Sequence, residues 1–88
     1  KNMYLTIELS EIKNLEKDKI SEKINIILSE EVKKFDLRQL DVKNDFFQAT
    51  YVIAIDNVVM LEKTIAKLNV SFPKISINYI DQNQIPSI

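Results

Sequence analysis

The sequence predicts a small α+β domain in which two helices cover one face of a four-stranded antiparallel sheet. Four segments carry apolar residues in the alternating pattern of β-strands. Two further segments carry them at the three- and four-residue spacing of amphipathic helices. The expected elements, in chain order, are a strand at Met3–Leu9, a helix at Lys19–Lys34, strands at Phe35–Lys43 and Phe46–Asp56, a helix at Val58–Asn69 and a strand at Lys74–Ile80.

The strand Phe46–Asp56 (FFQATYVIAID) is the segment around which we expect the domain to pack. β-Branched and aromatic residues dominate it, and both of its faces carry apolar side chains, which is typical of a central strand. One face carries Phe47, Ala49, Tyr51, Ile53 and Ile55, and the other carries Phe46, Gln48, Thr50, Val52 and Ala54.

The first strand and the first helix are each expected to bury one side. In Met3–Leu9 the odd-numbered residues are apolar. Ser10–Lys17 is expected to be a loop that buries Ile12 and Leu15, with a short helical turn as the alternative. The apolar side of the helix carries Ile20, Ile24, Ile27, Leu28 and Val32.

The two ends of the first helix carry charges of opposite sign. Asp18 is expected to cap the helix, because its carboxylate can accept a hydrogen bond from a free amide of the first turn. Lys33 and Lys34 are expected in the last turn, at the negative end of the helix dipole.

The second strand changes phase along its length. Its apolar residues alternate in one phase up to Leu37 and in the other from Leu40, so we expect either a bulge near Arg38 or a strand that begins there. Arg38 itself, the sole arginine, is expected to be a surface residue paired with Glu31 or Asp36. An edge strand protected by charge is indicated by three residues that would face water: Gln39, Asp41 and Lys43.

Glycine is absent, so we expect Asn or Asp wherever a tight turn needs a left-handed backbone. Asn44-Asp45 is the expected hairpin turn, and Asn57 the expected cap of the second helix. Val70 and Phe72 are expected to cover the end of that helix. Its apolar side carries Val58, Leu61, Ile65 and Leu68.

In the last strand, Ile75, Ile77 and Tyr79 are expected to point inward, and residues 81–88 to form a tail. The order β-α-β-β-α-β predicts a ferredoxin-like fold with strand order 4-1-3-2. Because both helices would cover the same face, the other face would be open, and contiguous exposed apolar surface usually binds a partner. We therefore expect a homo-oligomer formed through this open face or through the edge strands. The predicted interface residues are Phe46, Gln48, Thr50, Val52, Ala54, Tyr4 and Ile80.

Composition excludes several kinds of chemistry. The 88 residues include no Cys and no His, which removes thiolate and imidazole ligands and nucleophiles. Without Gly there can be no glycine-rich phosphate loop. A net charge of −1 argues against a nucleic-acid partner. We expect no catalytic residue, no cofactor and no metal site, and no apolar run is long enough to span a bilayer.

The segment Leu61–Ile80 (LEKTIAKLNVSFPKISINYI) resembles the end of ACT-like regulatory domains, especially the C-terminal cytoplasmic domain of MgtC/SapB-type bacterial membrane proteins. Those domains end in a Leu-Glu-rich helix, a short loop with Pro and an alternating strand. The resemblance implies a cytoplasmic, non-enzymatic regulatory or oligomerisation domain of an inner-membrane protein. The start at Lys1 fits a domain cut from a longer chain.

An alternative is an ACT domain of a soluble regulator or enzyme that senses an amino-acid-type small molecule. Its ligand would lie between the first strand, the first helix and a neighbouring subunit. ACT domains that bind amino acids usually carry a Gly in the loop after the first strand, and Ser10–Lys17 has none.

Overall fold

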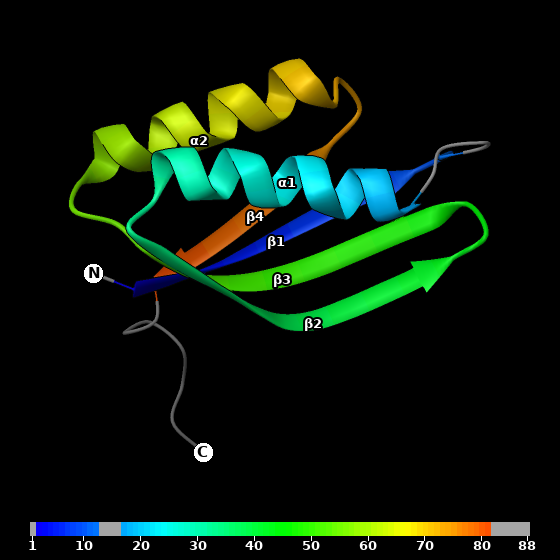
Figure 1. Ribbon diagram of the computed structural model, residues 1–88, viewed down its shortest axis with the longest axis horizontal. Helices are drawn as coiled ribbons and strands as arrows, with labels where there is room; N and C mark the ends of the chain where they lie inside the picture. Colours follow the sequence, from blue (N-terminus) through cyan, green and yellow to red (C-terminus); the bar gives the residue numbers. More distant parts are fainter. Residues whose placement is uncertain (1, 13–16, 82–88) are drawn as a thin grey trace.

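The computed structural model describes residues 2–12 and 17–81. Its elements are β1 (Asn2–Ser10), α1 (Lys17–Glu31), β2 (Lys34–Lys43), β3 (Phe46–Ala54), α2 (Val58–Ser71) and β4 (Ser76–Asp81). The strands form one antiparallel sheet in the order β2-β3-β1-β4, and both helices lie over the same face (Figure 1). The predicted α+β ferredoxin-like fold and strand order are confirmed. Asp81, predicted to begin the tail, still belongs to β4; residues 82–88 and the predicted burial of Leu15 lie outside the described residues.

The hydrophobic core lies between the sheet and the helices, as the alternating pattern predicts. Leu5 of β1 lies opposite Tyr51 of β3, and both side chains are buried. The Tyr51 hydroxyl donates a hydrogen bond to Oδ1 of Asn25 at 3.2 Å, and its ring meets that of Phe35 edge-on, with centroids 6.2 Å apart. These contacts join the central strand to both α1 and β2.

α1 starts and ends earlier than the predicted helix Lys19–Lys34. The amide of Lys33 donates to the carbonyl of Ala54 in β3 at 3.0 Å, and Lys34 is the first residue of β2. The prediction that both lysines lie in the last helical turn is therefore wrong, because the backbone of Lys33 hydrogen-bonds to β3 and Lys34 belongs to β2. Asp18 lies within the first turn, after the helix has begun, so it is not the cap residue; its carboxylate still suits the positive end of the helix dipole.

β2 contains the predicted bulge. Its pairing with β3 shifts register between Leu37 and Gln39, at Arg38. The extra residue compensates the phase change seen in the sequence, so that one side of the strand stays apolar along its whole length. Four residues lie opposite buried residues of β3, on the helix side of the sheet: Phe35, Leu37, Leu40 and Val42.

Asn44-Asp45 forms the predicted hairpin turn between β2 and β3. The expectation that Asn or Asp supplies the left-handed backbone is wrong, because Glu11 is the residue with a positive φ (55°) among the described positions. Glu11 directly follows β1, where the chain leaves the sheet. Such a backbone costs a residue with a Cβ atom roughly 1 kcal/mol or more, so the surrounding contacts must hold it there.

Asn57 caps α2 as predicted: its Oδ1 accepts a hydrogen bond from the amide of Met60 at 3.0 Å. The buried side of α2 includes Leu61 and Leu68, as predicted, together with Thr64. The hydroxyl of Thr64 donates to the carbonyl of Met60 at 2.8 Å. A threonine can therefore occupy a core position, because its only polar group is satisfied within the helix.

Two valines of α2 are placed differently from the prediction. Val58 is exposed because the buried side of the helix begins one turn later, at Leu61. Val70, predicted to cover the helix end, is 83% exposed because the helix continues past it to Ser71 and turns it outward. Phe72 alone covers this end, where its amide donates to the carbonyl of Leu68.

Candidate functional site

The predicted interface residues all lie on the open face of the sheet, but they do not form one apolar cluster. Tyr4 of β1 lies between Val52 of β3 and Ile80 of β4, and Ala54 follows at the same end of the sheet. Phe46 lies at the opposite end, between Ser10 and Lys43 (the pairs Ser10–Phe46 and Lys43–Phe46). The structure therefore brings together Tyr4, Val52, Ala54 and Ile80, here called the open-face cluster, and leaves Phe46 apart from it.

Polar pairs occupy the middle of the open face. The hydroxyls of Thr6 and Thr50 lie 3.1 Å apart, and Nε2 of Gln48 donates to Oε1 of Glu8 at 2.9 Å. Because these groups satisfy each other across the strands, this part of the face does not depend on a partner for its hydrogen bonds. Gln48 and Thr50, predicted as interface residues, are accounted for by these pairs.

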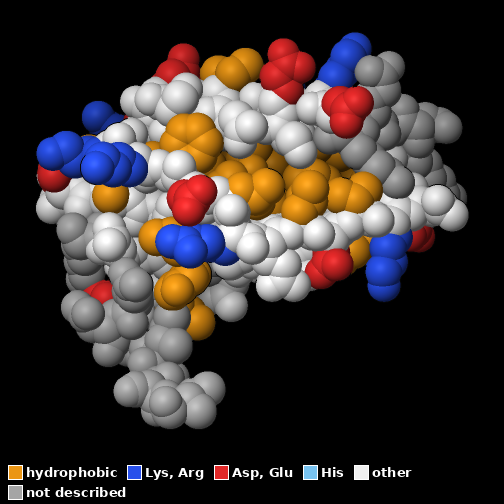
Figure 2. Space-filling view, turned by 60° about the horizontal axis from the view of Figure 1, so that its bottom comes forward, with side chains coloured by type: hydrophobic (Ala, Val, Ile, Leu, Met, Phe, Trp, Pro, Cys, Tyr) orange, Lys and Arg blue, Asp and Glu red, His pale blue; other side chains and the backbone are white. Residues whose placement is uncertain are grey.

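A more exposed apolar surface lies on β2, where the sequence had suggested a strand protected by charge. Leu37, Leu40 and Val42, here called the β2 strip, are 46%, 46% and 40% exposed. α1 reaches the start of this strand, where Phe35 packs against the core, but these three side chains further along the strand remain exposed. Figure 2, in which the β2 edge comes forward, shows a band of hydrophobic side chains across the middle of that face.

The charged residues of β2 do not protect the strip, because they lie on the other side of the sheet. Asp36 pairs with Val52, Asp41 with Gln48 and Lys43 with Phe46, all on the open face. The prediction of a charge-protected edge is thus correct for one side of the strand only. The sequence did contain a signal for this apolar side of β2, since a bulge at the phase change places all four apolar residues of the strand on one side.

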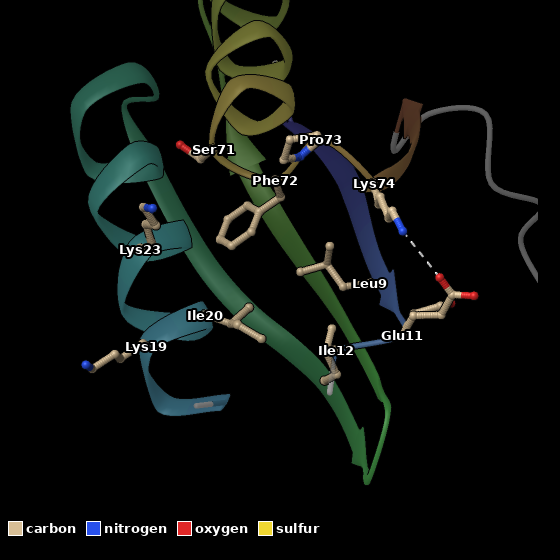
Figure 3. Close-up of a pocket in the computed structure, with 11 residues that line it drawn as sticks. Leu9, Glu11, Ile12, Lys19, Ile20, Lys23, Ser71, Phe72, Pro73 and Lys74 are labelled. Carbon is tan, nitrogen blue, oxygen red and sulfur yellow. Dashed lines mark hydrogen bonds and ion pairs between the residues drawn. The ribbon is translucent and has the colours of Figure 1, made fainter. Parts of the chain in front are cut away.

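A cavity of about 640 Å³ lies where β1 ends, between the first turns of α1 and the connection from α2 to β4. Figure 3 shows Leu9, Ile20 and Phe72 directed toward its centre. Lysine side chains come from two sides of its rim. The lining residues are Leu9, Ser10, Glu11, Ile12, Lys19, Ile20, Lys23, Ser71, Phe72, Pro73 and Lys74.

Two contacts fix the charged groups around this cavity, which we call the β1-end pocket. Nζ of Lys23 lies 5.7 Å from the centre of the Phe72 ring, a cation–π distance. Nζ of Lys74 lies 3.5 Å from Oε2 of Glu11, the residue with the left-handed backbone. The pocket therefore has an apolar interior, and among its described lining residues three are lysines and one, Glu11, is acidic.

Other charged groups have structural explanations. Arg38 pairs with Asp36 at 3.3 Å, one of its two expected partners. The other, Glu31, instead lies 2.6 Å from Nζ of Lys67, and this hydrogen bond raises the pKa of Lys67 above its ordinary value. The Lys67–Glu31 contact joins α2 to the end of α1, which gives both groups a structural role.

Within residues 2–12 and 17–81, no three acidic, His or Cys side chains gather closely enough to hold a metal ion. In the same residues, no helix combines the length and apolarity required to traverse a bilayer.

Comparisons with known proteins agree on the fold. No family model matches the chain, and no curated protein matches it. Among solved structures, the de novo designed protein Foldit4 is similar with a TM-score of 0.59 at 8% identity, over 93% of this chain and 99% of that one. The designed protein Ferredog-Diesel gives a TM-score of 0.60 at 7% identity, over 92% and 85%.

A natural protein shows the same likeness. A formyltetrahydrofolate deformylase from Pseudomonas putida KT2440 gives a TM-score of 0.60 at 13% identity, and the match covers 98% of this chain but 30% of the deformylase. At such identities the likeness concerns the fold alone. Two designed proteins and part of an enzyme share the architecture, so the fold does not define an activity.

Proposed function

We propose that this chain is a non-catalytic regulatory domain that associates with copies of itself, and that it belongs to a bacterial membrane protein. The observation that carries self-association is the β2 strip. It combines large exposed apolar side chains with the outer edge of a long strand, which pairs with no other strand in the part of the chain that the structure describes. Such an edge favours the addition of another strand.

The partner proposed for this edge is a second copy of the chain. An antiparallel pair of β2 strands centred on Val42 would place Asp41 of each copy opposite Lys43 of the other, since these residues flank Val42 on the same side of the strand. Opposite charges across strands stabilise such a pair modestly, by roughly 0.2–1 kcal/mol each. Only Asp41–Lys43 of each copy would pair in this arrangement, because β2 ends at Lys43, and the β2 strips of the two copies would meet end to end at Val42 on the two-fold axis.

The experiment is light scattering during size-exclusion chromatography on wild type and three lysine variants. Leu40→Lys changes the β2 strip, Val52→Lys changes the open-face cluster, and Val59→Lys is the control at an exposed position of α2. We expect only Leu40→Lys to shift the oligomer toward the monomer. If Val52→Lys acts instead, the open face is the contact; if wild type is monomeric at the highest concentration tested, self-association is refuted.

The membrane-protein part of the proposal rests on the resemblance of Leu61–Ile80 to MgtC/SapB-type C-terminal domains. It predicts that the complete gene encodes several membrane-spanning segments before this domain, and that the domain faces the cytoplasm. The full reading frame tests the first statement, and a reporter fused after the domain in bacterial cells tests the second. A full-length gene without such segments would remove this part and leave self-association untouched.

The β1-end pocket favours a second candidate, the sensing of a small molecule. Its volume of about 640 Å³ falls within the range of ligand pockets, roughly 300–1,000 Å³. A thermal-shift screen with amino acids, nucleotides and organic acids tests this function, because a ligand that binds only the folded state raises the unfolding midpoint by mass action. No shift with any compound would count against it.

A further inference from the structure

The second outer edge of the sheet is formed by β4, and it has none of the features that commonly keep an edge strand from pairing. In residues 2–12 and 17–81, β4 pairs with β1 alone, so its other side is an outer edge of the sheet (Figure 1). Residues 76–80 include no charged residue and no proline, and their pairing with β1 continues without a bulge. Charges, prolines and bulges are the common protections of an edge strand. The β4 edge is therefore open to the addition of another strand.

The β2 edge differs from the β4 edge in both respects. β2 contains the bulge at Arg38 and carries charged residues of both signs along its length. A bulge disrupts the regular spacing of the backbone groups along an edge. A regular strand such as β4 pairs continuously with another regular strand, and the β4 of a second copy supplies one.

Large apolar side chains are exposed on both sides of β4. Tyr79 is 48% exposed and Ile80 is 43% exposed. Tyr79 lies opposite Leu5, a buried residue on the helix side of the sheet, whereas Ile80 lies opposite Tyr4 on the open face. Because Tyr79 belongs to the outermost strand, its position on the helix side does not bury it. A strand added at this edge would cover apolar surface on both faces of the sheet.

An antiparallel pair of β4 strands centred on Asn78 matches these side chains. On the helix side, Tyr79 of each copy would lie opposite Ile77 of the other, and aromatic with β-branched residues is a favourable cross-strand combination. Ile77 already packs against the core, so the second copy's tyrosine ring would extend the core across the contact. On the open side, Ile80 would lie opposite Ser76. The two Asn78 side chains would meet at the centre, where each amide group can donate to the other.

From this self-complementarity we propose that the β4 edge is a contact between two copies of the chain, which joins their sheets into one. The two-fold axis is perpendicular to the sheet, so the helices of both copies lie on the same face. The β4 contact goes beyond the β2 contact proposed above and does not depend on it. Where both contacts form, every pair of copies keeps two free edges, so copies add in an open-ended row rather than a closed dimer.

The experiment uses Leu40→Lys as its background, because this substitution removes the β2 contact. Light scattering over a series of concentrations gives the dissociation constant of the remaining dimer. Adding Asn78→Lys or Asn78→Asp places like charges opposite each other at the axis, and each should weaken dimerisation about fivefold. An equimolar mixture of the two double variants brings opposite charges together and should return to within about twofold of Leu40→Lys. This rescue requires that position 78 of one copy meets position 78 of the other.

The controls separate the contact from folding and from net charge. Asn78 is exposed, so the fold accommodates either charge, and circular dichroism checks this for each variant. Asn69→Lys and Asn69→Asp make the same changes at an exposed position of α2. These two variants should leave dimerisation unchanged, both alone and mixed.

The outcomes distinguish the two contacts. If Leu40→Lys is monomeric at every concentration, if the Asn78 substitutions have no effect, or if mixing does not restore the dimer, the β4 contact is overturned. If Leu40→Lys dimerises only after residues 82–88 are deleted, the chain's own tail occupies the edge in place of a second copy, which also overturns it. If wild type and Leu40→Lys are both dimers, the β2 contact fails and the β4 contact stands.

Discussion

The assignment of the two faces of β3 can be tested with two neighbouring phenylalanines. Phe47 is fully buried beneath the helices, so Phe47→Ala removes a benzyl group from a packed core and leaves a cavity. Substitutions of this kind cost about 3–5 kcal/mol. At about 0.05–0.15 kcal/mol per residue, a chain of 88 residues has a total stability of about 4–13 kcal/mol. The variant should therefore be close to unfolded if the wild-type stability lies at the lower end of this range, and folded but clearly less stable if it lies at the upper end.

Phe46→Ala is the matched control, since it makes the same chemical change one position earlier on the other face. Phe46 is half-buried and lies at the polar end of the open face, so we expect a loss below about 1 kcal/mol. Urea unfolding followed by circular dichroism gives both values, at a protein concentration low enough that the proposed self-association does not contribute. Equal losses for the two variants would refute the assignment of Phe46 to an uncovered face.

Three further predictions concern single groups. Asn57→Ala removes the side-chain acceptor of the Met60 amide and should cost about 1 kcal/mol in urea unfolding, whereas Asn57→Asp should keep most of the stability. Thr64→Val removes a hydroxyl bonded within its own helix while keeping the shape of the side chain, so its stability should stay within about 1 kcal/mol of wild type; a larger loss would mean that the hydroxyl has another role. Burial raises the pKa of Tyr51 above its ordinary value of 10.0. Because the folded pKa exceeds the unfolded one, the contribution of Tyr51 to stability is complete below pH 10 and is lost as the pH rises through the folded value. The difference in phenolate absorbance between wild type and Tyr51→Phe measures this titration, and a midpoint below that of unfolded tyrosine would contradict it.

The candidate surfaces show where sequence reasoning stops. The open-face cluster was predictable, because alternation assigns Tyr4 and Val52 to one side once the strands are known. The β2 strip was not assigned, because alternation alone does not say how far along an edge strand the helices cover its apolar side. The β1-end pocket joins residues far apart in the chain, from Leu9 to Lys74, and no local pattern relates them.

The sequence by itself determined the order of helices and strands, the strand order, the cap at Asn57 and the two faces of β3. These features follow from local periodicity and from the few ways in which such an order can pack. At Arg38 it left two alternatives, a bulge or a later start of the strand, and the pairing of β2 with β3 decided for the bulge. The tertiary structure alone decided where α1 ends, because the Lys33 amide donates its hydrogen bond to the carbonyl of Ala54 in the sheet. It also decided which residues on the open face of β3 lie beside apolar residues of the adjacent strands. Phe46 and Val52 share that face, but cross-strand register places Val52 beside Tyr4 and Ile80 and leaves Phe46 at the polar end.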